Sequence, residues 1–145
     1  MHRLYVFVNT DLPSMTPGKA MAHSGHAANA AVFRLRNTAT GIELLNDWEG
    51  DLGFGTQINL YAPWTDVEDL VEASKSVYWC GLVNDPTYPY LASSELLNLL
   101  PNKLLALDQG DGKHMYFREQ VTAAWFFCKD GQHSLSARLK EFPLA

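Results

Sequence analysis

The sequence predicts an α/β fold: a three-layer α/β/α sandwich built on a mixed, mostly parallel four-stranded sheet. Two observations support this prediction. Short apolar runs typical of strands alternate along the chain with longer stretches that carry helix-start signals. The chain also has 145 residues, 47% of them hydrophobic, which suits one domain with its own core. In such folds ligands bind beyond the carboxyl ends of the strands.

The first strand and the first helix have the clearest signals. The apolar run at residues 4–8 has strand character and leads into a short loop that carries Asp11. Thr16 offers the hydroxyl of an N-cap, and Pro17 suits the first helical turn, where a missing N–H costs nothing. Gly25 costs roughly 1 kcal/mol against Ala inside a helix, so we expect a buried helix with close packing or close ligand approach at that residue.

The later elements continue the alternation of helices and strands. They are expected as a helical segment at 41–48, a strand at 56–62, a helix at 66–74 capped by Thr65 or Asp66, a strand at 77–83, a strand at 121–128 and a helix or strand at 134–140. Residues 1–145 form a single domain in this interpretation.

An insertion at about residues 86–120 interrupts the alternation. Its sequence predicts an extended or turn-rich stretch at 86–90, a short helix at 93–100 and a turn at 109–113. Because a long excursion before a core strand is more often functional than neutral, we interpret the insertion as a lid or a partner surface.

The charge of the chain is uneven. The net charge is −5, and the residues between Arg36 and Lys75 include eight acids and no Lys or Arg. Residues 1–36 instead carry four Lys or Arg side chains against the single acid Asp11, so a polyanion would approach from that side. A general nucleic-acid binder is normally basic overall, so this balance disfavours tRNA as a partner.

The sequence also suggests a compartment. The first residues lack the pattern of a signal peptide, and no apolar run approaches the ~20 residues that span a bilayer, so we expect a cytoplasmic protein without a membrane partner. Cys80 and Cys128 fall in predicted strands without a CxxC pair, which favours buried, reduced thiols.

Three ionisable residues of the first helix lie on one stripe. Lys19, His23 and His26 are four and three residues apart, which places them within about 60° of one another. A zinc site is one alternative, with the two histidines joined by Asp11, Asp85, His114 or His133. The i, i+3 spacing and the absence of an HExxH motif or a Cys cluster argue against it, and we expect neither a metal nor a cofactor.

Each of these residues also has a purely structural interpretation. Lys19 could pair with Asp11 or Asp85, and His26 could be a core histidine bonded to a backbone carbonyl. Asp11 could act only as a loop cap. What favours function is the joint occurrence of these residues at one strand-to-helix junction.

The junction resembles a known signature. Thr10-Asp11-Leu12, Met15, Gly18-Lys19, Ala22 and His26-Ala27 resemble the N-terminal motif of the type II, archaeal and eukaryotic, peptidyl-tRNA hydrolases. The resemblance covers residues 3–85 and, more loosely, 121–129. It implies hydrolysis of the ester between a peptide and tRNA, and a homodimer. It also implies catalytic roles for Lys19, His26, Asp85 and Asp11, and substrate binding by Thr10, Gly18, His23 and Thr87.

The chemistry of ester cleavage agrees with these residue types. A water must be activated by a carboxylate or imidazole, and the developing oxyanion needs a cation or a donor. Asp85 or Asp11 could activate the water, whereas Lys19 and His26 could stabilise the oxyanion. Free N–H groups at the start of the helix, at Gly18, would favour a phosphate or the terminal ribose.

The chain departs from the family pattern at three places, one of which is the insertion, which replaces a short loop of the family. His23 replaces a glutamine, and residues 86–90, Pro-Thr-Tyr-Pro-Tyr, replace an Ala-Gly-x-Thr-Gln motif, which leaves Thr87 as the substitute for the family threonine. Two functions therefore stay open. One is a peptidyl-tRNA hydrolase-like enzyme, and the other is a protein that binds a protein partner or a small anionic ligand through the 86–120 insertion.

Overall fold

The computed structural model describes residues 1–93, 106–108, 113–131 and 134–145. The chain divides into two compact units. Unit 1 is made of Met1–Val83 and Thr122–Ala145, and unit 2 is made of Asn84–Val121. No helix among the described residues combines the length and the apolar character needed to cross a bilayer.

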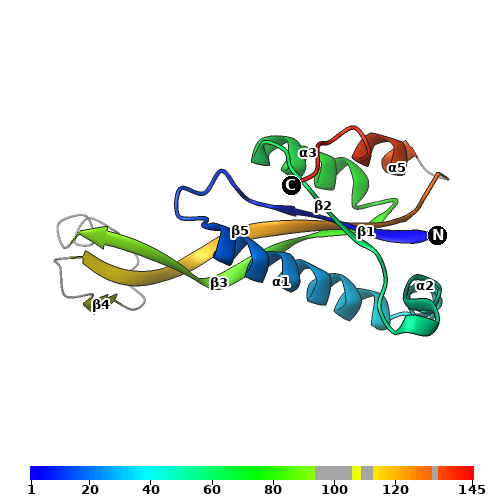
Figure 1. Ribbon diagram of the computed structural model, residues 1–145, viewed down its shortest axis with the longest axis horizontal. Helices are drawn as coiled ribbons and strands as arrows, with labels where there is room; N and C mark the ends of the chain where they lie inside the picture. The colour runs from blue at the N-terminus through cyan, green and yellow to red at the C-terminus, as the bar shows by residue number, and fades with distance from the viewer. Residues whose placement is uncertain (94–105, 109–112, 132–133) are drawn as a thin grey trace. The chain divides into compact units, whose positions relative to one another are not determined.

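The sheet has the strand order β2-β1-β5-β3 (Figure 1). Strand β1 (His2–Val8) pairs in parallel with β2 (Gln57–Leu60), which sets Tyr5 opposite Ile58. On its other side β1 pairs antiparallel with β5, which sets Tyr5 opposite Phe126. The remaining strands of this path are β3, Trp79–Ser93, and β5, Lys113–Lys129. The expected α/β fold is thus confirmed.

The sheet is mixed, and the expectation that it is mostly parallel is wrong. Helices between two strands return the chain so that the second strand runs parallel to the first, as α1 and α2 do between β1 and β2. The strand expected at 121–128 does not follow this pattern. That strand is the end of a longer one, β5, which runs antiparallel to its neighbour β1.

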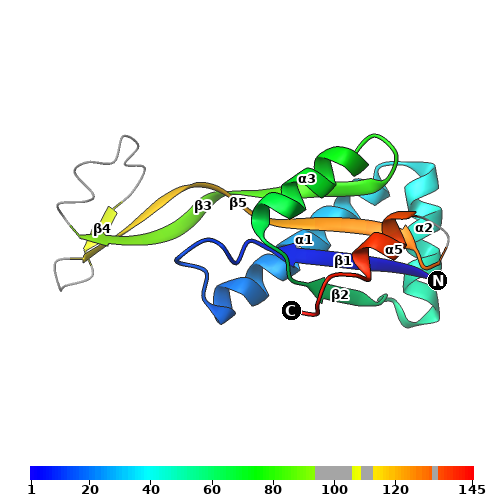
Figure 2. The same cartoon turned by 90° about the horizontal axis from the view of Figure 1, so that it is seen from above.

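Helices cover both faces of the sheet in unit 1. Figure 1 shows α1 (Pro17–Arg36) and α2 (Ala39–Glu49) on one face, and α3 (Trp64–Ser74) and α5 (Ser134–Leu139) on the other. Seen from above in Figure 2, α3 and α5 lie over the strands, oblique to the strand direction. The 3-10 turn η1 (Gly50–Leu52) follows α2.

Strand β1 is buried on both of its faces. Its residues Tyr5 and Phe7 face the side of α5, where the Phe7 ring meets Phe126 and Phe142 edge-on, with centroids 5.8 and 5.3 Å away. Alternate residues of β1 join the core cluster on the α1 side, which contains Leu4, Val6, Ala27, Ala31, Leu35, Leu45, Ala123, Trp125 and Phe127. Burial on both faces is why the strand reads as a continuous apolar run.

Helix α1 begins where the sequence predicts. Thr16 is the N-cap with extended backbone, and its hydroxyl accepts a hydrogen bond from the Lys19 N–H at 3.3 Å. Pro17 is the first helical residue, where its missing N–H leaves no donor unpaired.

The expectation that α1 is a buried, closely packed helix is wrong for most of its surface. Ala27 and Ala31 lie in the core, whereas Ala22 and Gly25 are exposed. A Cβ added at Gly25 would have no neighbour within 4 Å, so no packing contact requires glycine there. A helix beside a sheet buries one stripe only, and small residues on the other faces do not bring in a second partner.

The start of α3 corrects a second expectation. The helix begins at Trp64, so neither Thr65 nor Asp66 is its cap. Pro63 is the N-cap residue and has no side-chain donor or acceptor to offer. A side chain from another segment, Asp11, takes over this task and accepts the Trp64 N–H at 2.7 Å.

The segment after α5 covers the edge of the sheet. The sequence predicts either a helix or a strand at 134–140, and the structure has the helix α5 there. Beyond it Leu144 forms an antiparallel bridge with Leu60, and the Tyr61 N–H donates to the Pro143 carbonyl at 2.9 Å. This pairing satisfies backbone groups of β2, which would otherwise be an open edge strand.

Unit 2 contains the outer parts of β3 and β5 and the short strand β4 (Ala106–Asp108), which pairs antiparallel with β5. Residues 86–90, expected as extended or turn-rich, belong to β3. The ring of Tyr90 stacks on Tyr116 at 5.3 Å and meets Tyr88 edge-on at 5.0 Å. Tyr88 is fully buried, so these rings form a small core of unit 2. The helix expected at 93–100 and the turn expected at 109–113 lie almost wholly outside the described residues.

Both cysteines are buried and free, as the sequence predicts. Burial raises the pKa of the Cys128 thiol to about 11 and also raises that of Cys80. A thiol with a raised pKa carries little thiolate, the reactive form, near neutral pH.

We expect the native thiols to react slowly with iodoacetamide at pH 8. Because the pKa of Cys128 lies well above 8, its alkylation should be at least about 100-fold slower in the native protein than in the urea-unfolded chain. Mass spectrometry of labelled peptides measures both rates. Equal rates in the two states would show that this thiol is neither buried nor shifted.

Two glycine substitutions should have opposite effects on stability. Gly25→Ala should raise the free energy of unfolding by up to ~1 kcal/mol, because the site is open and alanine favours the helix. Gly41→Ala should lower it by about 1–3 kcal/mol, because its Cβ would lie 2.0 Å from the Leu35 carbonyl oxygen. Urea unfolding measures both, and a stabilising Gly41→Ala would contradict this packing.

Candidate functional site

The candidate site lies at the carboxyl end of β1. The Asn9 N–H donates to the Thr122 carbonyl at 2.7 Å, which holds the end of the strand against β5. The Thr10 N–H then donates to the Val8 carbonyl at 2.8 Å and turns the chain away from the sheet. Thr10 and Asp11 are exposed in the loop that follows.

Lys19 lies in the first turn of α1, where the cap at Thr16 fixes the backbone. Its side chain is half-buried, and this partial loss of water lowers the pKa of its ammonium group. A lowered pKa means that the charge is less well solvated than that of a surface lysine. Gly18, one residue earlier, is exposed, and nothing lies within 4 Å of where its Cβ would be.

The two histidines of α1 differ in their environment. His26 is exposed, whereas His23 is only 4% exposed and lies on the face that packs against the sheet. Their rings meet edge-on with centroids 5.1 Å apart. The two rings lie side by side on one stripe of the helix, as the spacing predicts, and the buried part of α1 includes His23 and leaves His26 outside it.

Asp11 is tied to α3. Its Oδ2 atom accepts the backbone N–H of Trp64 at 2.7 Å, a residue 53 positions away in the sequence. A carboxylate at the start of a helix is favoured by the free N–H groups and by the macrodipole. Of the interpretations in the sequence analysis, the structure gives Asp11 a capping role, with a distant helix in place of its own loop.

A pocket of about 340 Å³, named here the α1 pocket, lies between α1, the end of β1 and β2. Of the candidate residues, Thr10 lines it, and the polar side chains of Ser24 and Asn59 line it further along. Its other lining residues are Val6, Val8, Met21, Leu60, Tyr61 and Ala145. The pocket is therefore mainly apolar, with a few polar groups that can orient a ligand.

Three polar side chains beside this pocket form a network that the sequence analysis missed. Ser24 Oγ donates to Asn59 Oδ1 at 3.0 Å, and Gln57 Nε2 donates to Ser24 Oγ at 2.8 Å and to Asn59 Oδ1 at 2.9 Å. Alternation along a strand puts Gln57 and Asn59 on one face, which is a usable signal. Which helix residue meets them depends on the packing of α1 on β2.

Asp85 and Thr87 belong to unit 2, where they are close to each other. Asp85 Oδ1 accepts the backbone N–H of Thr87 at 2.9 Å and its hydroxyl at 3.3 Å. Asp85 is half-buried and Thr87 is exposed. The structure thus groups the predicted residues as Thr10, Asp11, Gly18, Lys19, His23 and His26 in unit 1, and Asp85 with Thr87 in unit 2.

Comparison with known proteins relates the chain to a family. A family model described as peptidyl-tRNA hydrolase PTH2 matches residues 2–77, which include β1, α1, α2, β2 and α3. No curated protein matches the chain.

Substitutions at Asp11 test whether its carboxylate caps α3. Asp11→Ala should lower the free energy of unfolding by about 0.5–2 kcal/mol, because the Trp64 N–H loses its acceptor. Asp11→Asn keeps an acceptor oxygen and should retain most of the stability. Thermal and urea unfolding measure both variants, and equal losses for Ala and Asn would contradict the capping role.

Proposed function

Because this chain belongs to the peptidyl-tRNA hydrolase PTH2 family, we propose that it hydrolyses the ester bond between a peptide and the 3′-terminal ribose of a tRNA. The observation that carries the proposal is the position of Lys19. Its side chain, whose ammonium group is partly desolvated, lies in the first turn of α1 on the same stripe of the helix as His23 and His26.

The reaction makes demands that these groups can meet. Water attacks the ester carbonyl, a base takes its proton, and the carbonyl oxygen becomes negatively charged in the tetrahedral intermediate. When the intermediate collapses, the C–O bond to the ribose breaks and the ribose oxygen takes a proton. A cation or a hydrogen-bond donor beside the carbonyl oxygen stabilises the intermediate.

Lys19 is proposed to stabilise this oxyanion. A charge interacts more strongly with a developing negative charge where water is partly excluded, and the lowered pKa of Lys19 reports that exclusion. His26 is exposed on the same helix and is proposed to assist as a donor. His23 is buried against the sheet and contacts the His26 ring, so its proposed role is to hold that ring in place.

The proposed base is a carboxylate. Asp11 has one oxygen committed to Trp64, which favours a positioning role for it. Asp85 is then the stronger candidate, and its role is proposed from the sequence resemblance. Thr87, whose N–H and hydroxyl both donate to Asp85, is proposed to orient that carboxylate.

The α1 pocket is proposed to take the peptide end of the substrate. Its apolar walls suit side chains of varied shape, and Thr10 with the Ser24–Asn59 pair offers polar contacts for the peptide backbone. The start of α1, at Gly18, is proposed to contact a phosphate of the tRNA end, because N–H groups and the macrodipole favour anions there.

The second candidate is a binding protein that has kept the fold. Unit 2 stands where the resemblance would place an Ala-Gly-x-Thr-Gln motif, and it has its own tyrosine core. Together with the net charge of −5, this observation favours a protein partner or a small anionic ligand over tRNA.

Turnover of peptidyl-tRNA by the purified protein tests the first candidate. Lys19→Gln and Asp85→Asn should each lower kcat/KM by at least about 100-fold, because each removes a group that acts in the transition state. His26→Gln should cause a smaller loss. The matched control is Lys75→Gln at the C-cap of α3, whose lysine is exposed and pairs with Glu72 at 2.8 Å, and it should retain full activity.

Two outcomes would contradict the proposal. Unchanged rates in the Lys19 and Asp85 variants would remove these residues from the mechanism. Absence of turnover by the native protein would favour the binding protein, whose partner should then be lost on deletion of residues 90–115. Circular dichroism of every variant shows that the fold is retained.

A further inference from the structure

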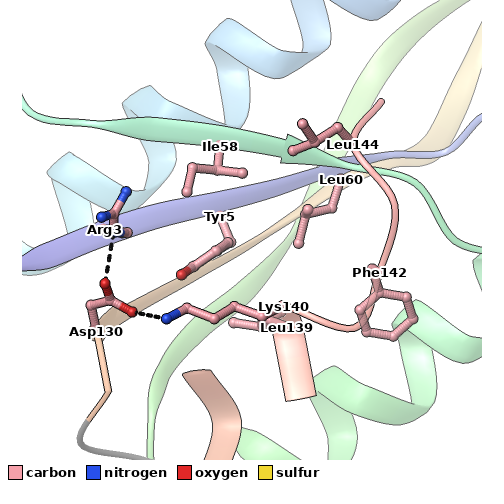
Figure 3. A pocket seen from close by; sticks show the side chains of 9 residues that line it. All are labelled: Arg3, Tyr5, Ile58, Leu60, Asp130, Leu139, Lys140, Phe142 and Leu144. Carbon is pink, nitrogen blue, oxygen red and sulfur yellow. Dashed lines mark ion pairs between the residues drawn. The ribbon is translucent and has the colours of Figure 1, made fainter. Parts of the chain in front are cut away.

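A second pocket lies on the opposite face of the sheet, away from α1. This α5 pocket has a volume of about 310 Å³ and is lined entirely by residues of unit 1 (Figure 3). Tyr5 lines it, whereas Leu4 and Val6, the neighbours of Tyr5 in β1, face the α1 side. The pocket is therefore separate from the proposed hydrolytic site, and nothing in the proposed function uses it.

The walls of the α5 pocket are mostly apolar. Ile58 and Leu60 come from β2, Leu139 from the end of α5, and Phe142 and Leu144 from the segment that follows it. Figure 3 shows the β2 side chains and Leu144 gathered on one side of the pocket and the charged groups on the other. A ligand that fits this division has an apolar part and a charged part.

The charged side has one positive charge in excess. Arg3 Nε lies 3.3 Å from Asp130 Oδ2, and the Lys140 ammonium pairs with Asp130 Oδ1. The Lys140 and Arg3 charges lower the pKa of Asp130, so this carboxylate is ionised near neutral pH. Two cations against one carboxylate leave a net charge of +1 at the pocket.

Tyr5 adds a hydrogen-bond donor. The residue is 1% exposed, and Figure 3 shows its hydroxyl directed toward the side of Asp130 and Lys140. Burial raises the pKa of this phenol above its usual value and outweighs the lowering by a hydrogen bond with Ser136, so the proton stays on the oxygen. A buried hydroxyl beside two cations suits an anionic oxygen better than a cation or an apolar group.

We propose that the α5 pocket binds a small amphipathic monocarboxylate. The carboxylate would lie by Arg3, Lys140 and the Tyr5 hydroxyl, where it balances the excess charge. An aliphatic chain of several carbons would lie along Ile58 and Leu144 and remove their exposed surface from water. The excess charge disfavours a metal cation, and the apolar walls disfavour a strongly hydrated inorganic anion.

Three probes of equal length test the charge requirement. Isothermal titration calorimetry with hexanoate, hexan-1-ol and hexylammonium should show hexanoate binding at least about tenfold more tightly than the other two. Equal binding of hexanol would reveal an apolar cavity without charge selectivity. Either that result or preferred binding of hexylammonium would overturn the proposal.

Two variants that change the net charge of the pocket in opposite directions test the roles of Lys140 and Asp130. Lys140→Gln removes the excess charge and should weaken hexanoate binding at least about fivefold, and the half-exposed Lys140 side chain can be replaced without opening the core. Asp130→Asn raises the net charge to +2 and should tighten binding. A purely structural ion cluster would give no such gain.

A matched control and a second residue complete the test. Lys75→Gln, remote from the pocket lining, should bind hexanoate like the native protein. Tyr5→Phe keeps the ring and removes the hydroxyl, so it should weaken hexanoate binding and leave hexanol unaffected. Unchanged hexanoate affinity in both Lys140→Gln and Tyr5→Phe would overturn the assignment.

Discussion

The burial of β1 on both of its faces is the constraint on which the rest of the structure depends. Residues Leu4 to Phe7 are at most 1% exposed, so both faces of this strand need cover. Helix α1 supplies it on one face, and the α5 side with Phe126 and Phe142 supplies it on the other. Because β1 lies between β2 and β5, its carboxyl end is fixed in space, and the loop that follows delivers Thr10, Asp11 and the start of α1 to a defined place.

The two faces of that strand carry different chemistry. Helix α1, on one side, carries a half-buried lysine and an exposed histidine on one stripe, borders a mainly apolar pocket along another, and belongs to the segment that matches the peptidyl-tRNA hydrolase PTH2 family. On the α5 side a tyrosine hydroxyl and an ion cluster with excess positive charge border a second apolar pocket. One alternating strand thus separates two pockets, because successive side chains point to opposite faces.

Capping shows how distant segments hold the candidate site in place. Thr16 caps α1 from the adjacent position, which is a local interaction and readable in the sequence. Asp11 caps α3 across 53 residues, so the same carboxylate that the sequence suggests for catalysis also joins the loop to a second helix. The Ser24–Gln57–Asn59 network ties α1 to β2 in a similar way. These contacts join the loop before α1, and α1 itself, to other elements of unit 1.

The sequence by itself determined the α/β class, the strand at the N-terminus, the capped start of α1 and the family, because these follow from local signals: an apolar run, a Thr-Pro helix start and a motif of fixed spacing. Only the tertiary structure decided that β5 runs antiparallel to β1, that His23 is buried while His26 is exposed, that Gly25 has no packing role and that α3 starts at Trp64 under the Asp11 carboxylate. The α5 pocket belongs with these, since its walls come from β1, β2, the turn after β5, the end of α5 and the segment that follows it. The direction of a strand and the depth of a side chain depend on which remote segment packs against it, and periodicity along one segment carries no record of that partner.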